Sequence, residues 1–332
     1  MIRRGWFNGR ITGFHNILKR PVDPGPIPGP RMTIQMEENQ SKKTWHDKHY
    51  KTLLIIPLVI ILFSFVYLGI FHSQNNDFIY KDISLTGGTS LTLYGQFDIQ
   101  TVKNDLSSQL TDLNIKEISD LTTGKQLAII LETTTEGDET KSIVQNYVGY
   151  TLDDENSSFE FTGSSLSDSF YRQLLFAILV AFIFMAIVVF IIFRTAVPSG
   201  AVIISAFADI LMTIVAVDIL GIKMSSAGII ALLMLIGYSV DTDILLTNRL
   251  LKRHDGTLNE RIHGAFKTGI TMTLTSLVAV GVALVVVKSF SITLTQIFLI
   301  LVIGLTFDIF NTWITNVSIL KWYSLKKHGG KK

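Results

Sequence analysis

Six long apolar stretches alternate with polar segments along the chain. The first two, residues 52–71 and 173–193, contain no charged side chain. Each has about 20 residues, the length that lets a helix cross ~30 Å of hydrocarbon. Four more follow at residues 200–220, 226–246, 269–287 and 293–320. The pattern predicts a polytopic α-helical membrane protein with six transmembrane helices.

The polar segment between the first two spans, residues 72–169, has the pattern of a folded α+β domain. Short runs with strand-like composition are separated by two helix-like stretches. The expected strands are residues 89–94, 115–119, 126–132 and 158–162, and the expected helices are residues 98–111 and 139–150. The order β-α-β-β-α-β predicts a ferredoxin-like domain between transmembrane helices 1 and 2.

Basic residues set the expected orientation. Ten Lys and Arg residues precede the first span, against four acidic residues. Further clusters follow the fourth span (Arg249, Lys252, Arg253, Arg261, Lys267) and the sixth (Lys321, Lys326, Lys327, Lys331, Lys332). The positive-inside rule places all three segments, and both termini, in the cytoplasm. Residues 72–169, with sixteen acidic and five basic residues, are then extracytoplasmic in a multi-pass protein of the cytoplasmic (plasma) membrane.

The chain ends are predicted to lie outside these folded parts. Residues 1–51 lack the apolar core of a signal peptide and carry five prolines within residues 21–30. They are interpreted as a flexible basic arm that either docks on anionic lipid or a ribosome or is simply solvated. The predicted division is residues 1–51 arm, 52–71 first helix, 72–169 outer domain, 170–320 five-helix bundle and 321–332 basic tail. Asn156 fits a glycosylation sequon, whose use the sequence leaves open.

Enzymatic functions find no support in the motifs. The chain has no cysteine, which excludes disulfides, thiolate metal sites and thiol catalysis. The segment Gly87-Gly88-Thr89 is too short for a nucleotide-binding P-loop and lacks its lysine. Neither a GxSxG nor an HExxH motif occurs. No enzyme activity, cofactor, metal or nucleic-acid partner is expected.

Carboxyl groups inside the predicted spans are the strongest functional signal. A charge at membrane depth costs about 2.5–3.5 kcal/mol, so such residues usually face a bundle interior and have a function. The string GYSVDTD holds Asp241 and Asp243, and Asp209 and Asp308 lie in the third and sixth spans. Asp209, Asp241 and Asp308 are each expected ~8–18 Å from the cytoplasmic face. These four residues are the candidates for a proton relay, with Asp241 the first choice.

Neighbouring polar residues repeat at helical spacing. Asp308 is followed at offsets of three, four, seven and eight by Asn311, Thr312, Thr315 and Asn316, which share one helix face. Asp241 and Asp243 are about 200° apart around the axis, so one cavity should not receive both. Gly237 lies one turn before Asp241 and permits close approach of another helix. Arg249 is the nearest basic residue on the same helix.

The string GYSVDTDILLTNRLLKR (residues 237–253) resembles the fourth-span motif of SecF proteins in the SecD/SecF family, which is related to the resistance-nodulation-division (RND) superfamily. LTGGTSL (residues 85–91) is similar to the signature that opens the outer domain in that family, including Thr86, Gly87, Gly88 and Thr89. The layout agrees over residues 52–320.

The motifs depart from the bacterial form in three places. After Gly237-Tyr238-Ser239, bacterial SecF has an apolar residue and Asn-Asp, whereas this chain has Val240-Asp241-Thr242 and so resembles the archaeal form. Thr271 stands where bacterial members carry an Arg, and Ser84 where they have Asp. Asp209 matches the acidic residue of the family's third span. The acidic residue of the fourth span, Asp241, is therefore displaced by one position from the bacterial motif, and the Arg expected as its basic partner is missing at position 271.

The resemblance implies an accessory subunit of the Sec translocase. It would act with SecD, a second six-span protein, in the lipid bilayer and help unfolded preproteins through the SecYE-containing translocon, driven by the proton motive force. An RND-type proton-coupled transporter of small molecules or lipids is the alternative. A third interpretation is a scaffold in which hydrogen bonds from the acids only hold helices together, and Asp218, near the outer end of its span, fits that account best.

Overall fold

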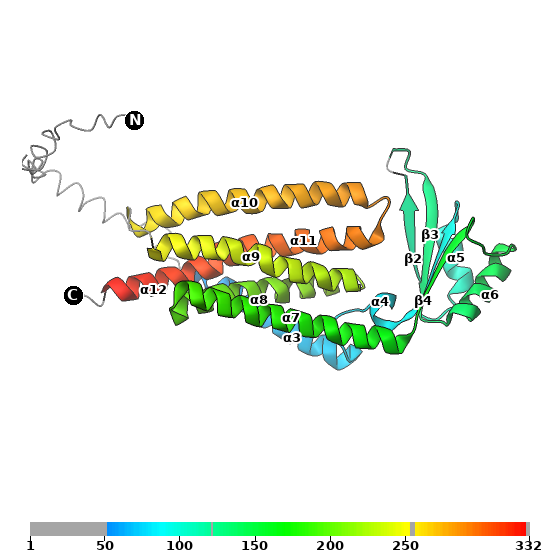
Figure 1. Ribbon diagram of the computed structural model, residues 1–332, viewed down its shortest axis with the longest axis horizontal. Helices are drawn as coiled ribbons and strands as arrows, with labels where there is room; N and C mark the ends of the chain where they lie inside the picture. Colours follow the sequence, from blue (N-terminus) through cyan, green and yellow to red (C-terminus); the bar gives the residue numbers. More distant parts are fainter. Residues whose placement is uncertain (1–51, 121, 253–255, 330–332) are drawn as a thin grey trace, which may run out of the picture. The chain divides into compact units, whose positions relative to one another are not determined.

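In the residues that the computed structural model describes, six helices are long and apolar enough to cross a membrane; Figure 1 shows their arrangement. The structure describes residues 52–120, 122–252 and 256–329, which belong to one compact unit of the chain. The predicted arm, residues 1–51, and the last residues of the tail lie outside this part. The membrane helices are α3 (Ile55–Asn75), α7 (Ser164–Phe193), α8 (Ala196–Ile219), α9 (Ser226–Lys252), α10 (Leu258–Val287) and a sixth made of α11 (Ile292–Phe310), η2 (Asn311–Asn316) and α12 (Val317–Gly329). The prediction of six spans is confirmed.

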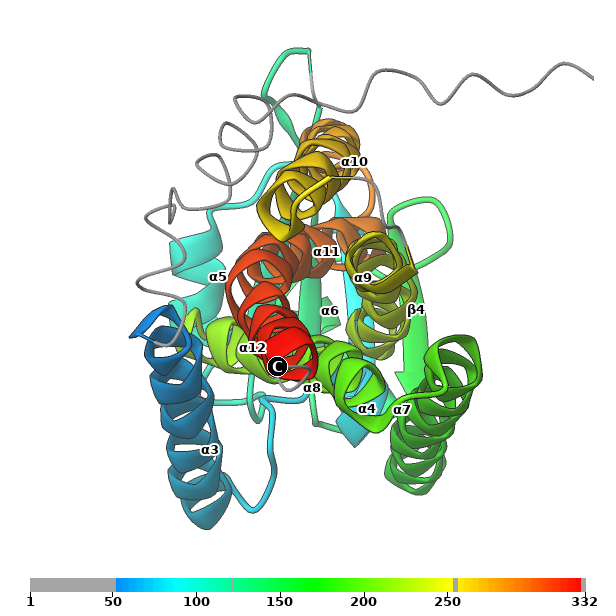
Figure 2. The same cartoon turned by 90° about the vertical axis from the view of Figure 1, so that its left-hand side faces the viewer.

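The helices of the bundle differ in how far they are buried. About two thirds of the most apolar part of α8 and over half of that of α9 are buried, against about a tenth in α7 and α10. An end-on view shows α3, α7 and α10 around the outside, with α8 and α11 further in (Figure 2). Because lipid is as apolar as a protein core, the outer helices can expose apolar residues on several sides. The polar residues of the spans are therefore concentrated where α8, α9 and α11 meet.

The outer domain is a four-stranded antiparallel sheet with two helices. Its elements are β1 (Gly88–Tyr94), α5 (Ile99–Leu106), β2 (Asn114–Ser119), β3 (Gln126–Thr133), α6 (Gly137–Val148) and β4 (Ser157–Thr162). The strand order is β2-β3-β1-β4, with every neighbouring pair antiparallel. This is the β-α-β-β-α-β arrangement predicted from the sequence.

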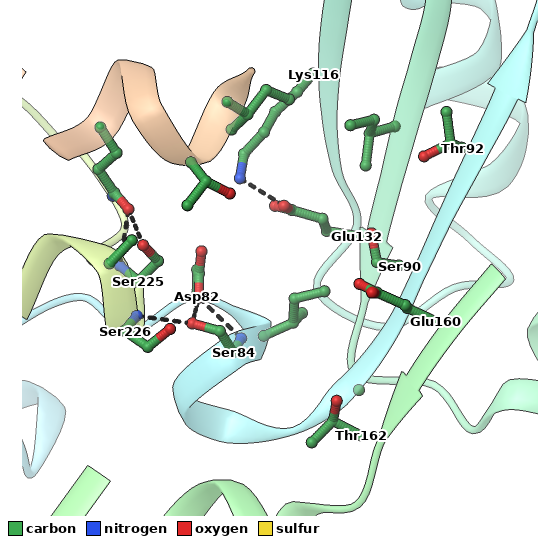
Figure 3. Close-up of a pocket in the computed structure, with 17 residues that line it drawn as sticks. Asp82, Ser84, Ser90, Thr92, Lys116, Glu132, Glu160, Thr162, Ser225 and Ser226 are labelled. Carbon is green, nitrogen blue, oxygen red and sulfur yellow. Dashed lines mark hydrogen bonds and ion pairs between the residues drawn. The ribbon is translucent and has the colours of Figure 1, made fainter. Parts of the chain in front are cut away.

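Alternation along the strands gives the sheet one apolar and one polar face. Leu91 and Leu93 of β1 pack with Ile129 and Leu131 of β3 and with the helix residue Val144. The residues that alternate with these along the strands, including Ser90, Thr92 and Glu132, line a cavity of about 280 Å³ on the other face of the sheet (Figure 3). The strand period of two explains why each strand contributes to both faces.

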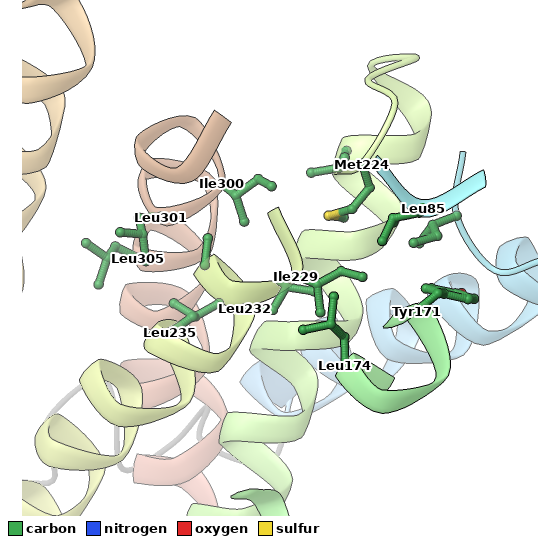
Figure 4. Packing of buried hydrophobic residues seen from close by; sticks show 13 residues of the cluster. Leu85, Tyr171, Leu174, Met224, Ile229, Leu232, Leu235, Ile300, Leu301 and Leu305 are labelled. Atoms are coloured by element: carbon green, nitrogen blue, oxygen red, sulfur yellow. The ribbon is translucent and has the colours of Figure 1, made fainter. Parts of the chain in front are cut away.

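An apolar core joins the short helix α4 (Ile83–Thr86) to the membrane helices. Leu85 of α4 packs with Tyr171 and Leu174 of α7, with Met224 of the α8–α9 loop and with Ile229 of α9 (Figure 4). The same cluster continues to Leu305 of α11. Each fully buried apolar side chain of this size contributes about 1.5–3 kcal/mol. The entry into the outer domain is therefore packed on the bundle.

Backbone hydrogen bonds reinforce this attachment at what we call the outer joint, residues 77–84 with residues 218–226. The Met224 N–H donates to the Tyr80 carbonyl (2.6 Å), and the Asp82 N–H donates to the Met224 carbonyl (3.0 Å). The Ser226 N–H donates to the Ser84 hydroxyl (2.9 Å). The Asp218 carboxylate accepts from the Tyr80 N–H (3.3 Å), which fits the structural role expected for it. The α8–α9 loop and the chain entering β1 are thus held together.

Ion pairs also lie at or beside the outer joint. Lys81 pairs with Asp77 at 2.6 Å, and the Tyr171 hydroxyl donates to Asp77 at 2.8 Å. Burial opposes ionisation of Asp77, but the bonds from Lys81 and Tyr171 prevail and lower its pKa below the usual value. Lys223 pairs with Asp112 of the outer domain at 2.9 Å.

Candidate functional site

Three carboxyl groups from three helices form the carboxyl cluster, defined as Asp209 of α8, Asp243 of α9 and Asp308 of α11. Each has 0% of its surface exposed. The helices that supply them contact one another pairwise. Because a bare carboxylate in an apolar interior is expensive, their burial requires either partners or protons.

Hydrogen bonds connect the cluster through the sixth membrane helix. The Ser239 hydroxyl donates to Asp209 at 2.5 Å, and the Asn311 amide donates to the same carboxyl at 2.7 Å. Asn316 donates to Asp243 at 2.7 Å. The Asn311 amide oxygen in turn accepts from Thr315 at 3.2 Å. Side chains of α8, α9 and η2 therefore share one polar network.

Thr312 lies between two of the carboxyls. Its hydroxyl oxygen is 2.9 Å from Asp243 Oδ1 and 3.2 Å from Asp308 Oδ1. A hydroxyl has one hydrogen to donate, so it can serve only one carboxylate at a time. The second contact is satisfied when that carboxyl holds a proton and donates to the Thr312 oxygen. The arrangement is suited to moving a proton between Asp243 and Asp308.

A π-helix forms the side of the network that faces these acids. Residues Asn311–Asn316 wind as η2 between α11 and α12. Asn311, Thr312, Thr315 and Asn316 are all buried within it. Single π turns are rare in proteins, and many of those that occur lie at functional sites. The helical period identified these side chains, but no sequence signal indicated the wider turn.

No cation compensates the cluster within the described residues. The ion pairs Lys81–Asp77, Lys116–Glu132, Arg172–Asp168 and Lys223–Asp112 all lie at or outside the outer ends of the helices. Asp243 Oδ2 and Asp308 Oδ2 accept no hydrogen bond of ordinary geometry among the described residues, although the Ser205 hydroxyl lies near Asp243 and the Ser239 hydroxyl near Asp308. An unpaired buried charge costs several kcal/mol. A bound proton removes that cost, so these oxygens are natural proton acceptors.

Asp241 does not belong to the cluster, which corrects the expectation that it lies in the bundle interior. Its side chain is exposed on the face of α9 that points away from the helix bundle, beside Gly237 and Tyr238. Two residues turn the helix by about 200°, so packing Asp243 inward directs Asp241 outward. The structure thus brings together Asp209, Asp243 and Asp308, with Ser239, Asn311 and Thr312 as hydrogen-bonding neighbours.

Three further residues singled out in the sequence lie away from the cluster. The Arg249 guanidinium donates to the Gly264 carbonyl and ties α9 to α10. Thr271 is exposed, and its hydroxyl donates to the Lys267 carbonyl (2.7 Å) of its own helix. Gly237 has open space where a Cβ would stand. Position 271, where bacterial members carry an Arg, therefore lies on an exposed surface of α10.

The signature residues have a visible structural task. Gly87 and Gly88 have φ angles of 81° and 142°. A Cβ on Gly87 would lie 2.5 Å from the Ser164 Cα, and one on Gly88 would lie 2.3 Å from the Thr133 carbonyl oxygen. Only glycine fits such a backbone and such close approach. Thr86 and Thr89 flank this turn. The Thr86 hydroxyl donates to the Asp82 carbonyl (3.1 Å), and the Thr89 hydroxyl donates to the Thr135 carbonyl (2.8 Å).

The sequence analysis missed the outer joint. Asp82, whose side chain caps α4 by accepting from the Ser84 N–H (2.8 Å), lines the polar cavity with Ser225 and Ser226 (Figure 3). Asp82, which stands directly before Ile-Ser-Leu-Thr, was an available N-cap signal. Its pairing with Met224, however, joins residues more than 140 positions apart.

Comparison with known proteins agrees with this architecture. The family described as "Protein export membrane protein SecD/SecF, C-terminal" matches residues 141–326. The protein-export membrane protein SecF of Methanocaldococcus jannaschii is 40% identical over 283 residues, which cover 83% of this chain and 96% of that protein. SecF of Methanolacinia petrolearia is 38% identical, covering 85% and 95% of the two chains.

Solved structures show the same fold. The crystal structure of SecDF, a translocon-associated membrane protein from Thermus thermophilus, superposes with a TM-score of 0.65 at 16% identity. The match covers 88% of this chain and 42% of that longer one, so this chain corresponds to less than half of it. Together with the sequence matches, this shows that the chain belongs to the SecD/SecF family as a SecF-type, non-enzymatic protein-export membrane protein.

Proposed function

We propose that this chain is an accessory subunit of the Sec translocase that acts with SecD and couples preprotein translocation to the proton motive force. The carboxyl cluster carries the proposal. Three fully buried acids lie on three helices, no described cation neutralises them, and Thr312 bridges two of them. Adding or removing a proton there changes which hydrogen bonds the helices can make. Different protonation states then favour different helix packing.

A mechanical route leads from the cluster to the outer domain. Asp209 lies on α8 and Asp243 on α9, and the loop between these helices forms half of the outer joint. A shift of α8 against α9 would therefore move Met224 and the Tyr80–Asp82 segment bonded to it. The first strand of the outer domain begins at Gly88, separated from that segment by the short helix α4 and Gly87. Proton binding can thus be transmitted to the domain that meets the emerging preprotein.

The exposed face of α9 is the surface we assign to SecD. It carries Asp241, Tyr238 and Gly237, and the exposed Thr271 lies on the neighbouring α10. A carboxyl facing lipid at this depth is costly, so a protein partner is expected to cover it. Asp241 then contributes to the relay at the contact with SecD, and Gly237 allows close helix approach.

The remaining assignments follow from the family and the charge distribution. Both termini are cytoplasmic, and the acidic domain of residues 72–169 is extracytoplasmic. The SecYE-containing channel supplies the unfolded preprotein.

Two isosteric variants, Asp243→Asn and Asp241→Asn, test the proposal. Proteoliposomes with this chain, SecD and the channel would be assayed for preprotein translocation with and without a protonophore. We expect Asp243→Asn to lose at least about 90% of the proton-driven stimulation, as for removal of an essential proton carrier. Asp241→Asn should weaken SecD binding as well as stimulation.

Undiminished stimulation in Asp243→Asn, Asp209→Asn and Asp308→Asn would end the relay proposal and leave a scaffold role. Proton flux that depends on Asp243 without any effect on export would favour the RND-type transporter instead.

A further inference from the structure

The outer sheet has a free edge at β4. In the part of the chain that the structure describes, the strand order β2-β3-β1-β4 leaves one side of β4 without a neighbouring strand. The Tyr94 N–H donates to the Asn156 carbonyl at 3.0 Å, which fixes the phase of the β1–β4 ladder. Because bonded and non-bonded pairs alternate in antiparallel strands, the N–H and C=O groups of Phe159 and Phe161 point away from β1. These groups are available to another strand.

The two edges of the sheet differ in their protection. Strand β2 has a register shift between Ile118 and Ser119 and carries the charged residues Lys116 and Glu117. Bulges and charges of this kind prevent pairing with other chains. Strand β4 pairs with β1 over six residues without a register shift and has Glu160 as its single charged residue, and Phe159 and Phe161 are 39% and 51% exposed. Natural sheets seldom leave such an edge unprotected.

A side-chain pocket adjoins the same edge. It has a volume of about 50 Å³ and combines the apolar side chains of Leu91, Leu152 and Phe159 with the polar or charged residues Lys141, Asp153, Asp154 and Ser157. The pocket lies on the helix side of the sheet, where Phe159 also meets the start of α6 at Gly137. A strand added to an edge gains affinity from backbone bonds and selectivity from pockets for alternate side chains. This pocket suits a small apolar side chain.

Charge around the edge selects the occupant. Glu160 lies on the opposite face of β4 from the pocket, and Asp153, Asp154 and Glu155 precede the strand. Residues 72–169 have a net charge of −11, from five basic and sixteen acidic residues. A chain with basic residues on the Glu160 side is attracted, and an acidic chain is repelled.

We propose that the free edge of β4 accepts an extended segment of translocating polypeptide as a fifth strand. Apolar side chains of that segment face the pocket side and alternate with basic ones on the Glu160 side. The proposal rests on the export function proposed above and supplies a capture surface for it. Backbone pairing suits unfolded substrates of many sequences, because every non-proline residue offers the same N–H and C=O groups.

Cysteine trapping tests the position, because the chain has no cysteine of its own. The full chain in lipid nanodiscs would carry Ser158→Cys on β4 or, as the matched control, Ser119→Cys on β2. The probe is a seven-residue peptide that alternates valine and lysine and carries one cysteine at its end. We expect at least about fivefold more disulfide product at Ser158→Cys, and loss of that excess when the valine amides are N-methylated.

A second measurement tests the charge preference by fluorescence anisotropy with the labelled peptide. Glu160→Lys on β4 should weaken binding about fivefold, whereas Glu117→Lys on β2 should change it less than about twofold. A peptide that alternates valine and glutamate should bind more weakly than the lysine peptide.

Equal trapping at the two cysteines, or unchanged trapping of the N-methylated peptide, would overturn the proposal. Trapping of SecD by Ser158→Cys in native membranes, with no trapping of peptide, would also overturn it and assign the edge to the partner subunit. Neither assay needs a proton gradient. If peptide binding fails while Asp243→Asn still abolishes stimulated export, only the capture surface is disproved.

Discussion

The carboxyl cluster and the outer joint are both rich in polar groups, yet they treat charge in opposite ways. At the joint, Asp77 is paired with Lys81 and accepts a bond from Tyr171. In the cluster, Asp243 and Asp308 share one hydroxyl, and each has one oxygen that accepts no hydrogen bond of ordinary geometry among the described residues. Paired charges hold a structure in one arrangement, whereas unpaired acids leave room for a change of protonation. The joint is built as a fixed coupling and the cluster as the part that changes.

The largest stability effect should come from the turn that fixes the joint to the outer domain. Gly88→Ala places a Cβ 2.3 Å from the Thr133 carbonyl oxygen at a φ of 142°. We expect a loss of about 2–4 kcal/mol in the free energy of unfolding, because backbone must move on both sides. Gly149→Ala is the control, since its φ of 76° is also positive but nothing lies within 4 Å. Unfolding in detergent followed by circular dichroism measures both, and equal losses would show that close approach is unimportant.

Removing the bridging hydroxyl should have the next largest effect. Thr312→Val keeps the shape of the side chain but leaves Asp243 and Asp308 without a shared donor. We expect a cost of about 1–2 kcal/mol in the free energy of unfolding and a fall in proton-driven export. Thr306→Val removes a hydroxyl that donates only to the Val302 carbonyl on an exposed face, and it should cost less than about 0.5 kcal/mol. Equal effects of the two changes on export would argue against a bridge.

Neutralising one member of the ion pair at the joint should cost less, because the pair is partly solvated. Asp77→Asn removes the charge that faces Lys81, whose side chain is 21% exposed, and should lower the free energy of unfolding by about 0.5–1 kcal/mol. Asp308→Asn should change the free energy of unfolding less than that, because none of the described ion pairs involves Asp308. A larger loss from Asp308→Asn would reverse the comparison between the two regions.

The pH dependence should show the smallest of these effects. The folded-state pKa of Asp77 is lowered, so its contribution is present above its unfolded pKa of about 4. It is lost as the pH falls through the folded value, because the unfolded chain then binds more protons. The stability difference between the native chain and Asp77→Asn should therefore shrink below pH ~4. A difference that stays constant to pH 3 would mean that charge is not what Asp77 supplies.

Local patterns were sufficient for much of the fold. The spans are set by runs of apolar residues, and the strands of the outer domain by alternation and turn residues, both of which act over a few positions. The observed strands begin and end within one residue of those expected, for example Gln126–Thr133 against residues 126–132. Membrane helices extend beyond their apolar runs. Helix α10, for example, begins at Leu258, where Thr257 and Glu260 form a capping box.

Six spans, a ferredoxin-like outer domain and a polar face on the sixth span could be predicted from local patterns, because each depends on neighbours along the chain. The sequence also showed that Asp241 and Asp243 face different ways. Which of the two faces inward depends on the side of α9 that packs against α8 and α11, and the packing of these helices buries Asp243. The π turn at Asn311–Asn316 and the free edge of β4 were decided in the same way. Both result from contacts between segments far apart in the chain, which no local pattern records.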